Sequence, residues 1–276
     1  MPGSGFTDIR RFESLDSTNR YLLDEARAGA PHGVVAVADH QTAGRGRLGR
    51  RWEAPAGSNL LMSVLLRPRL PPGQRHLASA VVTLAAADAV AELGLRLGIK
   101  WPNDLLAPDG RKLAGVLAEA DLGSGSGAAG ERPAGERPGG ERPGGEPPAP
   151  IVVGIGINAN WPITDGDLPA GLVGSATSLR QQLDRPVDRA RLLESLLRSL
   201  GPRVADLDAP PGRKRQADDL RAACTTIGTT VRVDLADGHS FEGVATDVTP
   251  EGHLVVSTGD RPRTVVAGDV IHVRPG

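Results

Sequence analysis

The sequence holds few of the residues that form disulfides, thiolate metal sites or aromatic platforms. Its 276 residues include one cysteine, Cys224, together with three Trp, one Tyr and three Phe. A single cysteine excludes an internal disulfide and a thiolate-rich zinc site, and it fits a reducing compartment. The shortage of aromatic side chains argues against a surface that binds nucleic acid by stacking its bases.

The sequence also lacks a strong charge of one sign and a long hydrophobic run. The formal net charge is −1, which argues against a protein whose main function is to cover nucleic acid or an anionic membrane. The most apolar stretch, residues 77–95, is interrupted by Asp88 and Glu92. It therefore predicts a buried, alanine-rich helix and not a membrane span. The opening residues lack the basic and apolar blocks of a signal peptide, so we expect a cytoplasmic protein.

Residues 123–150 differ from the rest of the chain in composition. They are almost entirely Gly, Glu, Arg, Pro, Ala and Ser, with the repeats GERPA, GERPG and GEPPA. Such a segment has no large apolar side chain to offset the entropy cost of ordering, so we expect a disordered surface insertion. The apolar segments on either side, residues 112–120 and 151–158, predict the two strands of a hairpin. The insertion is therefore expected to interrupt one domain and not to separate two.

Hydrophobic periodicity predicts the elements around this hairpin. Asp16 and Ser17 precede a helical pattern that ends near Gly29, as an N-cap and a C-terminal glycine would give, and two buried strands follow at residues 34–38 and 60–66. Leucines at helical spacing over residues 193–204 predict an amphipathic helix on one face of the sheet. Beyond residue 225 the period becomes two, which predicts five short strands, at 231–235, 241–248, 254–257, 264–266 and 270–273. We therefore expect one large domain over residues 1–224 and a small SH3-like β-barrel over residues 225–276.

The strongest local signal for a binding site is the Gly/Arg loop at residues 44–51, GRGRLGRR, which lies between two predicted strands and just before Trp52. Glycines let a backbone approach a ligand closely, and guanidinium groups donate paired hydrogen bonds to phosphate or carboxylate oxygens. The combination suits a polyanion such as ATP. The loop matches neither a Walker motif nor a dinucleotide fingerprint. A solvated loop, or one that binds RNA, is the alternative interpretation.

Three further segments carry candidate site residues. In residues 100–105, KWPNDL, Asn103 and Asp104 either cap a turn or present acceptors to a ligand or to hydrated Mg²⁺. Lys112 begins an apolar strand, where its charge can either neutralise a reacting carboxylate in a cleft or extend into solvent. The glycines of residues 154–158, GIGIN, indicate close packing against a ligand or another chain.

Histidines and nucleophiles offer little further chemistry. The six histidines show no metal-binding spacing, and the sequence has no Gly-x-Ser-x-Gly elbow. The predicted chemistry is therefore electrostatic, with arginines and a lysine around a phosphate-bearing ligand and no protein nucleophile.

Five segments occur in the order found in biotin protein ligases, and the chain resembles that family from about residue 8 to its end. The segments are DSTN at 16–19, QTAGRGRLGR at 41–50, KWPND at 100–104, KLAG at 112–115 and GIGIN at 154–158. The resemblance implies an α+β fold with a mixed central sheet covered by helices, as in class II aminoacyl-tRNA synthetases and biotin ligases. It also implies a small C-terminal SH3-like β-barrel.

The resemblance implies a role for each matched residue. The expected biotin-binding residues are Ser17, Thr18, Asn19, Gln41, Gly44, Arg45, Gly46, Arg47, Lys112 and Gly115. The expected nucleotide-binding residues are Arg47, Arg50, Trp52, Asn103, Asp104, Lys112 and Asn158. Asp104 is also the candidate contact for Mg²⁺. The residues expected to act in catalysis are Lys112, Arg47 and Arg45.

These roles imply a ligase that uses biotin, ATP and Mg²⁺. Biotin and ATP would form biotinyl-5′-AMP and pyrophosphate, and a lysine of the biotin carboxyl carrier domain of an acyl-CoA carboxylase would then accept biotin and release AMP. Because Ser17 lies so near the start, we expect no winged-helix DNA-binding domain and no repressor activity. The long insertion departs from the family pattern.

Two alternatives and one question of assembly stay open at this point. A lipoate-type ligase would share the adenylation chemistry and the fold. A nucleic-acid-binding module would use the Gly/Arg loop and the C-terminal barrel instead. The chain could also form a homodimer.

Overall fold

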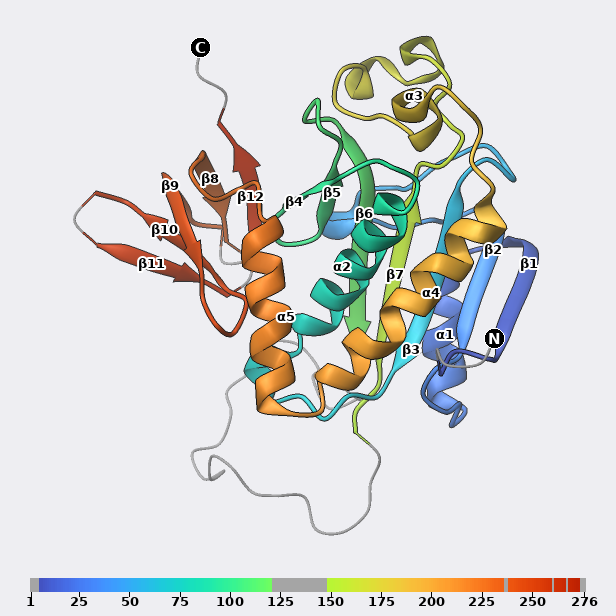
Figure 1. The fold of residues 1–276 in the computed structure, drawn as a ribbon, viewed down its shortest axis with the longest axis horizontal. Helices are drawn as coiled ribbons and strands as arrows, with labels where there is room; N and C mark the ends of the chain where they lie inside the picture. The colour runs from blue at the N-terminus through green and yellow to red at the C-terminus, as the bar shows by residue number, and fades with distance from the viewer. Residues whose placement is uncertain (1–4, 121–147, 236–237, 260, 267, 274–276) are drawn as a thin grey trace.

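A seven-stranded mixed sheet forms the centre of the larger part of the molecule (Figure 1). The computed structural model describes residues 5–120, 148–235, 238–259, 261–266 and 268–273. The strand order is β1-β2-β3-β7-β6-β5-β4, with β1 and β2 parallel and the other neighbours antiparallel. The strands are β1 Ile9–Leu15, β2 Val35–Gln41, β3 Leu60–Leu66, β4 Gly98–Lys100, β5 Asp104–Leu106, β6 Lys112–Ala120 and β7 Ile151–Ile157.

Helices cover both faces of this sheet. Helix α1 packs on β2, β3 and β7, whereas α2 packs on β5, β6 and β7 and is itself covered by α4 and α5 (Figure 1). The short α3 precedes α4. None of the helices in the described ranges is long and apolar enough to cross a membrane. The helices are α1 Thr18–Arg27, α2 Leu77–Ala91, α3 Leu179–Leu183, α4 Arg189–Asp206 and α5 Pro210–Ala223.

The C-terminal part is a separate five-stranded antiparallel sheet in the order β11-β10-β9-β8-β12. Its buried face joins the hydrophobic core around α2, so one apolar cluster runs through both sheets. Cys224 lies in this cluster, and burial raises the pKa of its thiol. The strands are β8 Thr230–Asp234, β9 Ser240–Val248, β10 Leu254–Ser257, β11 Pro262–Val265 and β12 Asp269–His272.

The structure confirms most of the predicted elements. Ser17 is the N-cap of α1, and its side chain accepts a hydrogen bond from the backbone N–H of Arg20. Gly29 has a φ of +90°, which stops the helix where a left-handed residue was expected. The two strands that flank the insertion pair antiparallel from Ala114↔Ile157 to Ala120↔Ile151, as a hairpin requires. Helix α5 was not predicted, because its few apolar residues give a weak period.

Two predictions about the organisation of the chain stay predictions. Most of the Gly/Glu/Arg/Pro insertion lies outside the described residues, which resume at residue 148. The division into two domains at residue 224 also stays a prediction, although the change from helices to antiparallel strands falls between α5 and β8.

Candidate active site

Period-two alternation in β7 gives the sheet one filled face and one hollow face. Val153, Ile155 and Ile157 point into the core beneath α2, whereas Gly154 and Gly156 leave space on the face that carries α1. The register places Gly115 of β6 beside Gly156 and Ser63 of β3 beside Gly154. Small residues on three adjacent strands therefore form a trough.

Side chains of this chain occupy part of the trough. A Cβ on Gly156 would lie 2.5 Å from Trp52, and a Cβ on Gly154 would overlap the side-chain oxygen of Asn19. The close packing expected for the GIGIN segment is therefore made by Trp52 and Asn19, and not by a second chain. The indole Nε1 of Trp52 is buried and has no hydrogen-bond acceptor in the described part of the molecule. Because buried donors are normally paired, this N–H is available to a ligand.

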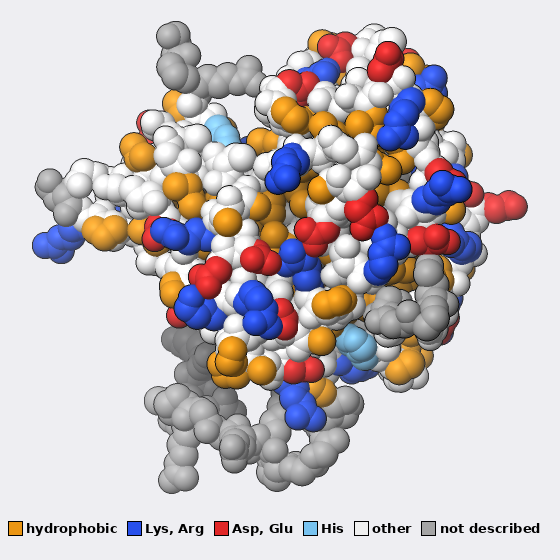
Figure 2. Space-filling view, viewed as in Figure 1, with side chains coloured by type: hydrophobic (Ala, Val, Ile, Leu, Met, Phe, Trp, Pro, Cys, Tyr) orange, Lys and Arg blue, Asp and Glu red, His pale blue; other side chains and the backbone are white. Residues whose placement is uncertain are grey.

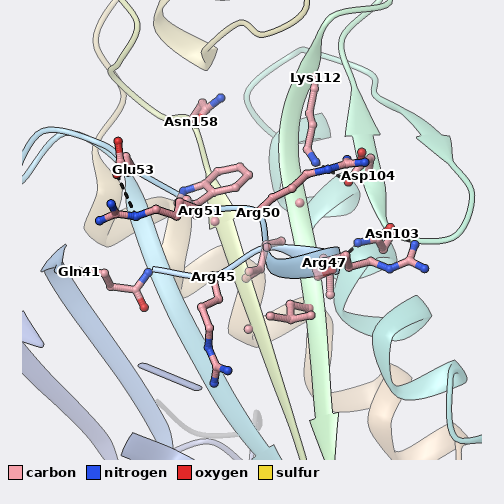
Figure 3. A pocket seen from close by; sticks show the side chains of 18 of the residues that line it. Gln41, Arg45, Arg47, Arg50, Arg51, Glu53, Asn103, Asp104, Lys112 and Asn158 are labelled. Atoms are coloured by element: carbon pink, nitrogen blue, oxygen red, sulfur yellow. Dashed lines mark hydrogen bonds and ion pairs between the residues drawn. The ribbon is translucent and has the colours of Figure 1, made fainter. Parts of the chain in front are cut away.

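A cavity of about 270 Å³ runs along the trough (Figure 3). All but one of the residues predicted for the site line it; the exception is Gly44. Gly44 instead lies against the carbonyl of Trp52, with no room for a Cβ. The predicted residues that line the cavity are Ser17, Thr18, Asn19, Gln41, Arg45, Gly46, Arg47, Arg50, Trp52, Asn103, Asp104, Lys112, Gly115 and Asn158.

One end of the cavity is polar, with a tight hydrogen-bond network. The backbone N–H of Thr18 donates to Gln41 Oε1 at 2.8 Å. The Ser63 hydroxyl lies 2.7 Å from the Thr18 hydroxyl and 2.6 Å from Asn19 Oδ1. These side chains come from the start of α1, the end of β2 and the middle of β3, so the tertiary fold creates this end.

The other end carries opposite charges at close range. Lys112 Nζ lies 2.6 Å from Asp104 Oδ1 and 5.7 Å from the centre of the Trp52 ring. The strands β5 and β6 hold this pair, because Asp104 begins β5 and Lys112 begins β6. An ammonium group fixed in this way can neutralise developing charge on a carboxylate or phosphate.

The Gly/Arg loop folds over the cavity as a small hairpin. The N–H of Gly46 donates to the carbonyl of Arg50 at 2.7 Å, and the N–H of Trp52 donates to the carbonyl of Gly44 at 3.0 Å. The loop is thus a folded hairpin, in which Arg45, Gly49, Arg50 and Arg51 stay exposed.

The arginines of this loop diverge (Figure 3). Arg47 donates to Asn103 Oδ1 at 3.1 Å and to the carbonyl of Gly268 at 2.6 Å, so it joins the loop to the C-terminal sheet. Arg45 points away from Lys112 and forms an ion pair with Glu119 at 3.0 Å.

Asn158 lines the cavity, but both ends of its amide are engaged inside the protein. Its oxygen accepts from Asn59 Nδ2 at 3.2 Å, and its nitrogen donates to the carbonyl of Thr177 at 2.9 Å. Asn59 Oδ1 also accepts the backbone N–H groups of Ala159 and Trp161. Asn158 therefore holds the chain that follows β7, and any contact with a nucleotide would come in addition.

Several site residues were missed by the sequence analysis. Ser63 and Glu119 interrupt an apolar and an alternating strand, and Asn59 directly precedes β3, so a polar residue in or beside an apolar strand was the only available signal. Trp161 and Leu172 line the cavity from the loop after β7. No spacing rule marks that loop, because its position depends on the network around Asn59.

Metal binding by the protein alone has no support in the described residues. They contain no group of three or more His, Cys, Asp or Glu side chains that could hold a metal ion. Two carboxylates line the cavity, Asp104 beside Lys112 and Glu53 beside Arg51. One or two carboxylates suit Mg²⁺ that arrives with nucleotide phosphates and keeps most of its water ligands.

The fold and the cavity define an α+β protein with a cleft that is polar at one end and carries charged side chains at the other. The family model described as Biotin/lipoate A/B protein ligase family matches residues 11–127, and that described as Biotin protein ligase C terminal domain matches residues 226–273. The biotin--[acetyl-CoA-carboxylase] ligase of Mycobacterium tuberculosis is 37% identical over 279 residues, covering 99% of this chain and 91% of the relative. The chain therefore belongs to the biotin protein ligase family.

Other relatives agree with this assignment. The bifunctional ligase/repressor BirA of Bacillus subtilis is 30% identical over 257 residues, which cover 93% of this chain and 71% of the relative. A solved structure of the biotin protein ligase of Aquifex aeolicus in complex with biotin and ATP superposes with a TM-score of 0.76. The two chains are 23% identical, and the superposition covers 98% of this chain and 100% of the Aquifex aeolicus chain. At this identity the superposition shows the fold.

Proposed function

We propose that this protein is an ATP-dependent biotin ligase. It joins biotin to AMP as biotinyl-5′-AMP, and it then transfers biotin to one lysine of a biotin carboxyl carrier domain. The observation that carries the proposal is the glycine-lined cavity, which has a neutral polar end and a cationic end with Trp52 between them.

The polar end suits a ring that both donates and accepts hydrogen bonds. A cyclic urea carries one carbonyl and two N–H groups, and Ser17, Thr18, Asn19 and Gln41 offer hydroxyl and amide partners of both kinds. The apolar face of Trp52 then suits the hydrocarbon chain of biotin. Biotin lying this way would place its carboxylate toward Lys112.

The cationic end suits the adenylation step. The biotin carboxylate attacks the α-phosphate of ATP, a new C–O–P bond forms, and pyrophosphate leaves. Lys112 and Arg47 both line the cavity, and in this proposal they neutralise the oxygens that gain charge in this step. Mg²⁺ bound to the ATP phosphates would supply further charge, with Asp104 as its contact on the protein.

The loop over the cavity suits the transfer step. An acyl adenylate is a mixed anhydride that water hydrolyses, so residues 44–52 must keep water out until the acceptor arrives. The acceptor lysine amine then attacks the biotinyl carbonyl, and AMP leaves.

A direct experiment tests the reaction. The pure protein is incubated with ATP, Mg²⁺, biotin and a biotin carboxyl carrier domain, and the carrier is examined by intact-mass spectrometry. We expect the mass of one biotinyl group on one lysine, and none when ATP is omitted. Modification with lipoate in place of biotin would instead establish the lipoate-type alternative.

The nucleic-acid alternative has less support. Positive and negative side chains are interspersed on the face shown in Figure 2, which α2 and α4 cover, so the described part of this face offers no field of one sign to a nucleic acid. The Gly/Arg loop is closed into a hairpin over the cavity by its own hydrogen bonds. Salt-sensitive RNA binding without biotin-dependent turnover of ATP would favour this alternative.

The cellular location and the oligomeric state of the protein belong to the same proposal. The protein is proposed to act in the cytoplasm, where ATP is supplied. The sequence leaves a homodimer open, and light scattering on the pure protein would give the oligomeric state. We do not propose a role in DNA binding.

A further inference from the structure

We propose that Glu119 is a positioning residue that couples closure of the Gly/Arg loop to the shape of the biotin end of the cavity. This inference rests on the proposed function, because it assigns Glu119 a role in holding biotin and its adenylate. The residue lies near the end of β6 and does not itself line the cavity.

One carboxylate bridges two parts of the site. Glu119 Oε2 accepts from Asn19 Nδ2 at 2.7 Å, and Oε1 pairs with Arg45 at 3.0 Å. The Glu119 side chain is 23% exposed, and that of Arg45 is 50% exposed. Asn19 belongs to the cavity floor and Arg45 to the loop above it, so Glu119 joins floor to loop.

The hydrogen atoms available fix the direction of the network. The Ser63 hydroxyl has one hydrogen, and Asn19 Oδ1 can only accept, so this hydrogen goes to Asn19. The Thr18 hydroxyl lies 2.7 Å from the Ser63 oxygen and 3.1 Å from Gln41 Oε1. Once the Ser63 hydrogen is on Asn19, the Thr18 hydrogen goes to the nearer oxygen, that of Ser63, since two oxygens at that distance need a hydrogen between them. Gln41 Oε1 accepts the backbone N–H of Thr18.

This direction depends on the other end of Asn19. The Asn19 amide nitrogen must face Glu119 for its oxygen to face Ser63, and Gly154 provides the space for that orientation. Without the carboxylate, the amide nitrogen keeps only the Leu117 carbonyl at 3.2 Å. Arg45 at the same time loses its ion-pair partner. A change at residue 119 therefore affects the cavity floor and the loop together.

A partly exposed ion pair contributes little to overall stability. Loss of the Arg45–Glu119 ion pair should therefore shift the equilibrium of loop closure more than it lowers the free energy of unfolding. We therefore expect Glu119→Gln, which keeps the size and an acceptor for Asn19, to fold normally and to hold biotin less well.

The test measures pyrophosphate release without a carrier protein. The first turnover reports adenylate formation, and the slower later rate reports escape of the adenylate. For Glu119→Gln we expect the biotin KM and the slow rate to rise about fivefold, the most that loss of one exposed ion pair would give. The first-turnover rate at saturating biotin should change less than about twofold, because Lys112 is untouched.

Three comparisons make the result specific. Glu25→Gln removes a similar ion pair, with Arg10 at 2.6 Å and a side chain 30% exposed, on the far side of α1, and should behave as wild type. Glu119→Asp should restore part of the lost affinity. Arg45→Gln combined with Glu119→Gln should be no worse than either alone, because both remove one interaction.

The outcomes separate the two proposals. An active wild type with an unaffected Glu119→Gln variant would overturn the role of Glu119 and leave the ligase function standing. Tighter biotin binding by the variant would also overturn it, since Glu119 would then compete with the ligand for Arg45. A wild type that releases no pyrophosphate with biotin would overturn the proposed function itself.

Discussion

Single residues in this site act through fixed partners. Lys112 is held by Asp104 at 2.6 Å and lies beside the Trp52 ring, so its charge has a defined position before any ligand arrives. A cation prepared in this way costs no reorganisation when charge develops on the substrate, and that is the usual origin of large electrostatic effects in catalysis.

Replacing Lys112 tests this directly. We expect Lys112→Ala to slow adenylate formation by about 100-fold or more, because one preorganised cation is lost and Asp104 is left unpaired in the cavity. Lys112→Arg should keep part of the rate, because it keeps the charge. First-turnover pyrophosphate release is the measurement, and a wild-type rate in the alanine variant would remove Lys112 from the reaction.

At the scale of elements, the hollow face of β7 decides where the ligand can lie. Gly154 and Gly156 alternate with Ile155 and Ile157 in β7. The isoleucine side chains therefore pack beneath α2, and the glycines place no side chain in the trough. The indole ring of Trp52 lies directly on the bare backbone of Gly156.

A single methyl group should disturb this arrangement. A Cβ at residue 156 would lie 2.5 Å from Trp52, so in Gly156→Ala the ring must move into the cavity. We expect biotin affinity to fall about tenfold, with a loss of about 1–3 kcal/mol in the free energy of unfolding. Gly73→Ala is the control, since a Cβ there has no atom within 4 Å. Calorimetric titration that gives equal affinities for both variants would contradict this view of the trough.

The β6–β7 hairpin makes a second prediction at this scale. Ala120 and Ile151 are paired neighbours, so a short turn can connect them directly. Replacing residues 122–147 with a few glycine-rich residues should leave pyrophosphate release unchanged, because the paired ends of β6 and β7 keep the hairpin in register without them. Loss of carrier biotinylation alone would indicate that the segment helps to dock the acceptor.

At the scale of the whole molecule, the C-terminal sheet is attached to the site through a few polar contacts and a shared core. Arg47 reaches the carbonyl of Gly268, and Trp101 Nε1 donates to the carbonyl of Gly252 at 3.1 Å. The rings of His76 and His253 lie 4.6 Å apart at the same interface, and His76 Nε2 lies 2.6 Å from the carbonyl oxygen of Glu251.

This interface should make stability depend on pH. Burial, with a smaller effect of His253, lowers the pKa of His76 to about 4. In the unfolded chain a histidine has a pKa of about 6.5. Between these values the unfolded chain binds a proton that the folded protein does not, so the free energy of unfolding should decrease as the pH falls from about 6.5 to about 4.

His76→Gln removes that titration and keeps a donor for the Glu251 carbonyl. Its urea-unfolding free energy should therefore depend less on pH than that of the wild type over this window. Identical pH dependence in the two proteins would show that His76 does not govern the interface.

The sequence by itself determined the elements and the chemical inventory. The Ser17 cap, the period of β3 and β7 and the strands beyond residue 225 are local patterns, and local patterns follow from helix and strand geometry. The order of five motifs was enough to indicate the family. Lys112 and the Gly/Arg loop contain residue types that supply charge or backbone flexibility, so the sequence could mark them as candidate site residues.

Only the tertiary structure decided which partners these residues have. Glu119, Ser63 and Asn59 act across strands and loops that lie far apart in the chain, and no spacing rule reaches that distance. The same holds for Arg47, whose contact with Gly268 spans most of the sequence. Contacts of this kind are set by strand order and packing between sheets, and a one-dimensional pattern does not contain that information.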